Sequence, residues 1–146
     1  MKTGLPRKQK GAVAIEFALV FVIFFAVLYG IISYSLPLLL MQSFNESTAE
    51  AVRRGVAVDP TVTGYKQVVE QRATDVLTQL LSWIPASLKF SVASDTSAVY
   101  ANGILTVRID YPSSKLNQVL PSLVLPGIGP VPNLPTTLSA QSSLQF

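Results

Sequence analysis

The chain has 146 residues, of which 49% are apolar and only 13% charged, and its mean hydropathy is +0.44. This length is close to that of one ordinary domain and argues against two compact ones. The sequence contains no Cys and no His. Disulfides, thiolate or imidazole metal sites, cysteine nucleophiles and a Ser-His-Asp relay are therefore excluded. The composition argues against an enzyme, a metal site or a cofactor, and it points to a chain that lies partly in a membrane.

The charged residues are unevenly placed, although 11 basic and 8 acidic residues give a net charge of only +3. Lys2, Arg7, Lys8 and Lys10 fall within the first ten residues, which contain no acid. From Ala12 onward there are 7 basic and 8 acidic residues. The cations form no continuous stripe with interleaved aromatic residues, so we expect no nucleic-acid partner.

A long uncharged segment lies between Glu16 and Glu46. As a helix, its apolar part from Phe17 to Leu36 would be about 30 Å long, which matches the hydrocarbon core of a bilayer. A removable secretory signal is the alternative, but this stretch exceeds the usual apolar core and no small-x-small site follows it. The preceding cations place the N-terminus in the cytoplasm and the chain after about residue 40 outside, with the lipid bilayer as a partner.

Helical spacing of apolar and small residues continues beyond the span. Pro37 predicts a kink near the outer interface, because it lacks the amide hydrogen and clashes with the preceding turn. Gly55 and the pair Asp59-Pro60 predict the end of the helix. We therefore expect one helix over residues 12–57, a membrane span continued by an amphipathic stalk, with two helices broken at Pro37 as the alternative. The expected inward face of the stalk consists of Leu38, Met41, Phe44, Thr48, Ala51, Val52 and Gly55.

The rest of the chain, residues 58–146, predicts an outer domain that begins with a second helix. Apolar residues repeat at helical spacing from Tyr65 to Ile84, and Pro85 ends the pattern. One face of this helix has to be buried. We expect Leu77 and Leu80 to pack on a sheet.

The segments after Pro85 alternate between apolar and polar residues, which is typical of strands. We expect strands over residues 88–92, 97–101 and 104–111, a tight turn at Asn102-Gly103, and a terminal strand over 136–146. The Pro-rich segment 112–135 contains six of the ten prolines and predicts an ordered loop without helix or sheet. The expected fold class is α+β, with one helix packed on an antiparallel sheet of three to four strands.

Residues 10–17, KGAVAIEF, place a carboxylate at the start of the apolar span. A carboxylate among apolar residues is costly in a membrane, so Glu16 is a candidate functional residue. In the alternative interpretation, Glu16 extends to the lipid headgroups at the membrane surface.

A short basic leader, Gly11, a small residue, a Glu five residues after that Gly and a long apolar helix resemble the type IV prepilin signature. This resemblance implies that a membrane aspartic peptidase cuts between Gly11 and Ala12, which removes residues 1–11. It also implies that Glu16 and the adjacent Phe17 serve in assembly.

Within that superfamily, residues 11–20, 29–32 and 49–57 resemble the TadE-like minor pseudopilins of tight-adherence (Flp) pilus systems. The resemblance implies a single-pass protein of the bacterial inner membrane with a cytoplasmic N-terminus and a periplasmic domain. Its implied partners are the prepilin peptidase, other pilins and pseudopilins, and the inner-membrane assembly platform. Ser33-Tyr34-Ser35 departs from many relatives, so TadE, TadF and another paralogue stay open. Major pilins are little more than a helix, which excludes that role by size.

Two other functions are weighed against pilus assembly. One is an uncleaved, anchored envelope protein whose outer domain binds envelope partners. The other is an enzymatic outer domain, which needs a Ser-Lys or paired-carboxylate pocket that the sequence does not reveal. Arg53 and Arg54 are interpreted as a solvated helix face, Trp83 as a core or core-edge residue, and the Asn45-Glu46-Ser47 sequon as a chance match.

Overall fold

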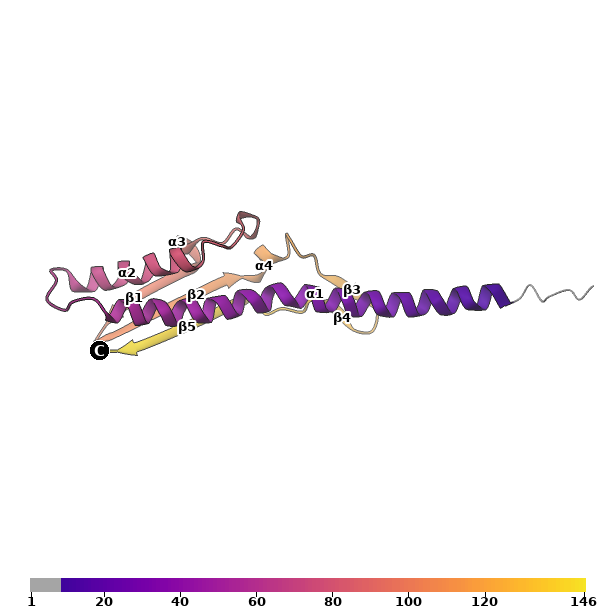
Figure 1. Cartoon of the computed structure of the whole chain (residues 1–146), viewed down its shortest axis with the longest axis horizontal. Coiled ribbons are helices and arrows are strands. Elements are labelled where there is room, and N and C mark those ends of the chain that lie inside the picture. The colour runs from indigo at the N-terminus through magenta and orange to yellow at the C-terminus, as the bar shows by residue number, and fades with distance from the viewer. Residues whose placement is uncertain (1–8) are drawn as a thin grey trace, which may run out of the picture.

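The computed structural model describes residues 9–146 and has the predicted α+β class: a long N-terminal apolar helix followed by a small domain of helices and antiparallel strands (Figure 1). Lys2, Arg7 and Lys8 of the predicted leader lie outside the described residues. The helical elements are α1 (Gln9–Val56), α2 (Tyr65–Leu80), the 3-10 turn η1 (Ala86–Leu88), α3 (Val92–Asp95) and α4 (Ser113–Leu116). The strands are β1 (Thr96–Ala101), β2 (Ile104–Pro112), β3 (Leu123–Leu125), β4 (Gly129–Val131) and β5 (Thr137–Gln145).

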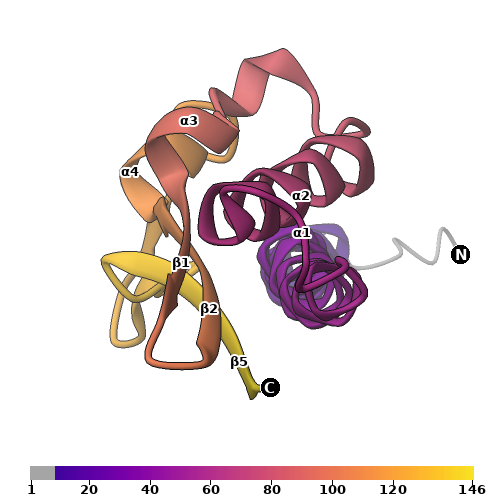
Figure 2. The same ribbon diagram turned by 90° about the vertical axis from the view of Figure 1, so that its left-hand side faces the viewer.

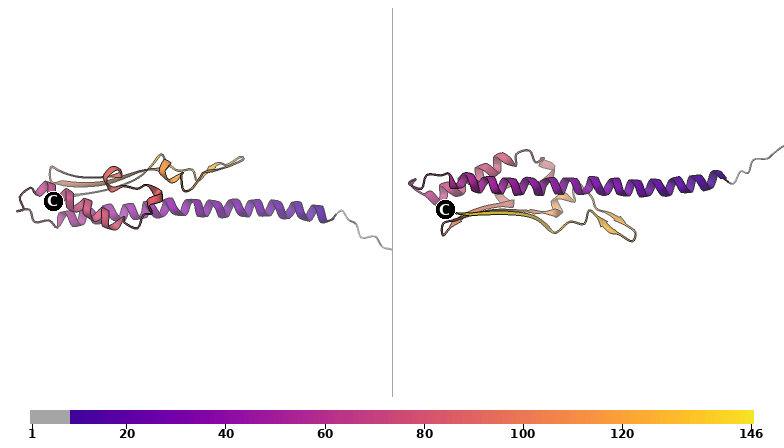
Figure 3. Two further views of the ribbon diagram at one scale, coloured as in Figure 1. Left: turned by 90° about the horizontal axis from the view of Figure 1, so that it is seen from above. Right: turned by 60° about the horizontal axis from the view of Figure 1, so that its bottom comes forward.

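Helix α1 is continuous over 48 residues and includes Pro37 in its interior. Figures 1 and 3 show it as a single rod that extends well beyond the rest of the molecule. Of the two alternatives from the sequence, the structure has one helix instead of two. A kink at Pro37 stays a prediction.

The C-terminal half of α1 is part of the domain core. One side of it is buried at helical spacing, at Ser33, Pro37, Leu40, Phe44, Ser47, Thr48, Ala51, Val52 and Gly55. The prediction was wrong at Leu38, whose residue surface is 66% exposed, whereas Leu40 is 1% exposed. The error arises because residues 38–41 are all apolar, so the sequence pattern cannot show which of them faces inward.

Three strands form an antiparallel sheet in the order β1-β2-β5, and α1 and α2 lie against one of its faces (Figure 2). The predicted alternation in β2 is confirmed, because Leu105, Val107, Ile109 and Tyr111 are buried. Leu77 of α2 is fully buried in the same core, as predicted, whereas Leu80 is only partly buried. Helix α2 ends at Leu80, before the predicted end at Ile84.

The β1–β2 hairpin and the terminal strand are also confirmed. Ala101 pairs with Ile104 across a two-residue turn in which Asn102 and Gly103 have φ angles of 52° and 76°. Left-handed backbone at both turn positions suits the right-handed twist of the strands, which is why Asn-Gly is a strong turn signal. Strand β5 pairs antiparallel with β2 along its full length.

The predicted strand over residues 88–92 is wrong. Lys89 has a left-handed φ of 51°, which ends η1 and interrupts an extended run. The backbone N–H of Ser91 donates to Asp95 Oδ2 over 2.9 Å, and the N–H of Asp95 donates to the Ser91 carbonyl over 2.8 Å. These reciprocal hydrogen bonds stabilise α3 instead of a strand. Phe90 nevertheless packs inward, with its ring centroid 5.6 Å from that of Phe44.

The Pro-rich segment 112–135 also differs from its prediction, because it contains α4 and the paired strands β3 and β4. Gly127 and Gly129 have φ angles of 80° and 98°, which lets the chain reverse within a few residues. In Figure 1 this β3–β4 hairpin lies beside α1, away from the three-stranded sheet and toward the N-terminal half of the helix.

Helix α1, helix α2 and the sheet meet at Gly55 of α1. A Cβ atom at this position would lie 2.4 Å from Leu105 Cδ2 of β2 and 3.7 Å from Val69 Cγ1 of α2. Both contacting residues are fully buried. The close approach of α1 to the sheet and to α2 therefore requires glycine at this position.

We expect Gly55→Ala to lower the free energy of unfolding by about 1–3 kcal/mol, because the added methyl overpacks a closed core. The measurement is thermal unfolding of the full chain in detergent, followed by fluorescence of Trp83, which is the only tryptophan. Gly30→Ala is the matched control, since a Cβ on Gly30 meets nothing within 4 Å. Equal midpoints for the two variants would contradict this packing.

Candidate functional site

The first part of α1, residues 11–25, has no packing partner within the described chain. Residues 11–25 are all exposed, and none of residues 11–32 is buried. The most apolar window of this helix has a mean hydropathy of 2.7 and is 0% buried. A helix with an exposed apolar surface of this length is compatible with a single-pass membrane anchor.

Gly11 and Ala12 lie near the start of α1, and both are exposed. A Cβ placed on Gly11 meets nothing within 4 Å, so packing within the chain does not require glycine there. The first turn of a helix has amides without intrahelical acceptors, and it is the part of a helix that opens most readily. Lys10 belongs to the same turn, and its side chain is outside the described part of the structure.

Glu16 and Phe17 also point away from the domain, because both lie in the fully exposed part of α1. Phe17 begins a row of stacked rings at helical spacing. The Phe17 and Phe21 centroids are 6.2 Å apart, and those of Phe21 and Phe25 are 6.4 Å apart. The predicted assembly residues thus share a surface that only lipid or another molecule can cover.

Pro37 is buried on the domain side of α1. It lines a mainly apolar hollow of about 480 Å³ together with Tyr34, Met41 and the segment 133–139 that enters β5. Pro37, which has no amide hydrogen, therefore lies on the side of α1 that packs against the rest of the chain.

A charged cluster lies near the C-terminal end of α1. Glu50 accepts hydrogen bonds from Arg53 Nε at 2.8 Å and from Arg54 Nε at 2.6 Å. These hydrogen bonds lower the pKa of Glu50 to about 2, and Arg53 contributes the largest part. The sequence predicted a solvated helix face. Both arginines are partly exposed, but both are also bound to Glu50.

A buried ion pair that the sequence analysis did not find joins α3 to α4. Lys115 Nζ lies 2.6 Å and 2.7 Å from the two carboxylate oxygens of Asp95, which is buried. No pattern in the sequence connects the two residues, because sheet topology brings them together. The pair lies beside the buried Tyr111 ring, 5.7 Å from Lys115 Nζ, and its role is structural.

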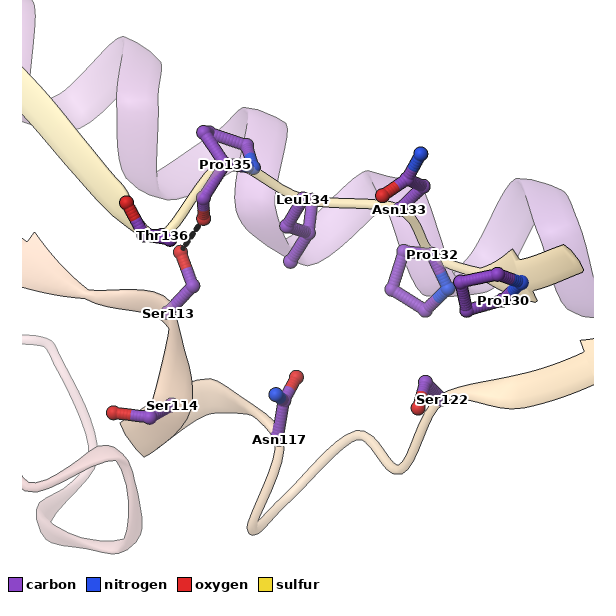
Figure 4. Close-up of a pocket in the computed structure, with 10 residues that line it drawn as sticks. All are labelled: Ser113, Ser114, Asn117, Ser122, Pro130, Pro132, Asn133, Leu134, Pro135 and Thr136. Atoms are coloured by element: carbon purple, nitrogen blue, oxygen red, sulfur yellow. Dashed lines mark hydrogen bonds between the residues drawn. The ribbon is translucent and has the colours of Figure 1, made fainter.

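Figure 4 shows a cavity of about 470 Å³ between α4 and the returning segment 130–136. Hydroxyl, amide and proline groups line it, and Ser113 Oγ donates to the Pro135 carbonyl over 2.5 Å. Its lining contains no charged side chain to act as an acid or a base. Across residues 9–146, no three His, Cys, Asp or Glu residues are grouped so that they could hold a metal ion.

Trp83 was interpreted as a core or core-edge residue, and the structure places it at the edge. Its indole Nε1 donates to Ser43 Oγ of α1 over 3.2 Å, and its side chain is partly exposed. This bond links the end of α2 to α1.

The fold and the exposed helix define a class of protein, in which one apolar N-terminal helix carries a small α+β domain. Residues 11–53 match the family model of the TadE-like proteins. The resemblance inferred from the sequence is confirmed for this segment, and it suggests a part in a Tad pilus system, whose TadE-like components are not an enzyme family. Comparison with curated proteins and with solved structures gives no match.

The matched segment ends at Arg53, so it covers the exposed half of α1 and most of its buried stripe. It contains Gly11, Ala12, Glu16 and Pro37, the residues singled out from the sequence. Within this segment, packing in the core explains why the residues near Ala51 are small. Packing within the chain does not explain the residue types at Gly11 and Glu16.

The Glu50 cluster predicts a pH dependence of stability. Its folded-state pKa of about 2 lies below the ordinary 4.5, so its contribution is complete above pH 4.5 and is lost as the pH falls toward 2. We expect Glu50→Gln to lower the thermal midpoint at pH 6 and to converge with the wild type at low pH. Glu46→Gln, one turn earlier on α1, is the control. A wild-type minus Glu50→Gln difference that stays constant from pH 6 to pH 2 would contradict the assignment.

Proposed function

We propose that this protein is a minor pseudopilin that takes part in the initiation or assembly of a Tad (Flp) pilus. The observation that carries the proposal is the exposed N-terminal half of α1, which coincides with the start of the TadE-like match at residue 11. The same helix is packed from Ser33 onward, so its two halves have different surroundings. An apolar surface that the chain leaves uncovered suits a helix that moves from a bilayer into a bundle of pilin helices.

Maturation is the first step of this proposal. The prepilin peptidase would cut between Gly11 and Ala12 at the cytoplasmic face and remove the basic leader. An exposed glycine with open space around it supports this site, because it offers the peptidase no bulky side chain and permits an extended backbone.

Cleavage creates a positive amine at Ala12, one helical turn from Glu16. In a bundle of such helices, the Glu16 carboxylate would be costly in hydrocarbon unless it met this amine, on its own subunit or on a neighbour. Most of the attraction at low dielectric is offset by desolvation, so the pair would mainly fix the axial register between subunits. The adjacent row of Phe rings would supply the apolar contact.

The proposed location is the bacterial inner membrane, with a cytoplasmic N-terminus and a periplasmic domain. The proposed partners are the prepilin peptidase, the other pilins and pseudopilins, the inner-membrane assembly platform and the lipid bilayer. The cations Lys2, Arg7, Lys8 and Lys10 supply the orientation through the positive-inside rule.

We expect Gly11→Val to block cleavage, since its bulky side chain next to the cleaved bond would clash with the peptidase. The measurement is mass spectrometry and N-terminal sequencing of protein extracted from membranes that contain the active peptidase. Gly30→Val, the same substitution at an open position of α1, should still begin at Ala12. Normal processing of Gly11→Val, or an intact Met1 in the wild type, would favour an uncleaved anchored envelope protein.

We expect Glu16→Ala to insert, fold and be processed but to lose co-assembly with its pilin partners. Glu16→Asp should be partly defective because its shorter side chain reaches less far. The measurement is crosslinking or co-purification of the processed variants with the other pseudopilins. Glu46→Ala, a carboxylate on the same helix beyond the apolar span, should behave like the wild type. Wild-type recovery of Glu16→Ala would assign Glu16 to the membrane interface instead.

A further inference from the structure

The β3–β4 hairpin belongs to a longer segment, residues 117–135, that we call the arm. The arm is fastened to the apolar part of α1 by two tyrosines. Tyr29 Oη donates to the Pro121 carbonyl, and the backbone N–H of Asn133 donates to Tyr34 Oη over 2.9 Å. Both tyrosines lie inside the span Phe17–Leu36 expected from the sequence.

The tip of the arm exposes apolar side chains. Val124 is 72% exposed and Ile128 is 75% exposed, and Pro126 lies between them. In Figure 3 the tip stands apart from α1, so the helix does not cover it. Exposed apolar residues grouped on one element mark a surface that meets something other than water.

No charged residue follows Lys115 in the sequence, so the whole arm is uncharged. Loops that face water usually carry charged side chains. The arm carries none, and it lies beside the segment of α1 between Glu16 and Glu46, which also has no charged residue. The uncharged arm, with its apolar tip, therefore lies alongside the membrane-compatible half of α1 (Figure 1).

The contact of Pro121 with Tyr29 sets the depth at which the arm is attached to α1. Tyr29 precedes Leu36 by roughly two helical turns, or about 10 Å, and elements that lie in the membrane interface are buried about 5–10 Å. Tyrosine is also enriched at that level of a bilayer. Among the described residues, strands β3 and β4 pair only with each other, so their outer edges need water or headgroups and exclude the hydrocarbon centre.

We infer that the arm is a second membrane contact, with Val124 and Ile128 inserted into the interfacial region of the outer leaflet beside α1. The inference rests on the membrane anchoring of α1 in the proposed function. Two contacts, a spanning helix and a shallow hairpin, fix the rotation of the domain about the α1 axis as well as its height above the bilayer. The occupant of this surface is lipid, because the uncharged arm lies alongside the spanning helix.

The absence of cysteine permits single labels without a background reaction. Val124→Cys and Ile128→Cys are labelled with an environment-sensitive fluorophore in the full chain. The chain is reconstituted at low protein-to-lipid ratio into vesicles of phosphatidylethanolamine and phosphatidylglycerol. Lipids with a nitroxide near the headgroup serve as quenchers in one set of vesicles, and lipids with a nitroxide deep in the acyl chain serve in a second set.

Two matched controls use the same substitution at exposed valines. Val22→Cys lies in the apolar half of α1 and reports insertion of the helix. Val62→Cys lies in the connection between α1 and α2, at the far end of the domain in Figure 1, and reports water exposure. A circular dichroism spectrum of each labelled variant verifies that it is folded.

We expect blue-shifted emission and lipid quenching several-fold greater at Val124 and Ile128 than at Val62, together with quenching at Val22 by nitroxides placed deeper in the acyl chain. Quenching at Val22 with tip labels indistinguishable from Val62 overturns the inference and leaves the anchoring intact, and the tip would then face water or a protein partner. No quenching at Val22 overturns both the anchoring and the inference.

Discussion

The continuity of α1 is the constraint on which the rest of the molecule depends. One helix is buried along a stripe from Ser33 to Gly55, is fully exposed from Gly11 to Phe25, and has no buried residue from Ala26 to Ile32. Although Pro37 removes one backbone hydrogen bond near this junction, α1 continues through it as one helix, so the orientation of the domain is coupled to that of the exposed half. A force or a rotation applied to the N-terminal half is therefore transmitted directly to the sheet. This coupling suits a protein whose helix would join an assembly while its domain faces outward.

The charged groups are separated along the same axis. The bonded cluster of Glu50, Arg53 and Arg54 lies near the outer end of α1, and the Asp95–Lys115 pair lies within the domain. Toward the other end, the exposed helix carries only Glu16 among apolar residues, and the arm carries no charge. An apolar stretch between the basic residues at the N-terminus and the charged groups of the domain favours one orientation at a membrane surface. The isolated Glu16 stands out against this separation, which is why it is the candidate for a role outside the chain.

Much of the fold could be predicted because its signals are local. The apolar run of α1, the 3.6-residue spacing of α2, the alternation in β2 and the Asn102-Gly103 turn each report the conformation of a few neighbouring residues. The failures have physical reasons as well. Lys89 adopts a left-handed conformation that its residue type does not predict. The Pro-rich arm contains two short paired strands, and its prolines led to the prediction of a loop.

The candidate site divides in the same way. Glu16 could be singled out because a carboxylate in an apolar run conflicts with the surrounding sequence, whereas Gly11 and Ala12 were singled out through the resemblance to the prepilin signature. The sequence could not predict that Leu40 is buried in place of Leu38, and it could not predict the Asp95–Lys115 ion pair. Tertiary packing determines both. The contact of the arm with Tyr29 and Tyr34 joins residues far apart in the chain, and nothing in either segment alone predicts it.

A distance measured along α1 in a bilayer tests the central claim that one rigid helix serves as both membrane anchor and domain core. Spin labels at Val22 and Glu46, both exposed, would be about 36 Å apart in a continuous helix at 1.5 Å per residue. Pulsed electron paramagnetic resonance of the full chain in lipid nanodiscs should give one narrow distribution near that distance. A broad or much shorter distribution would show that the helix breaks at Pro37 and that anchor and domain move independently.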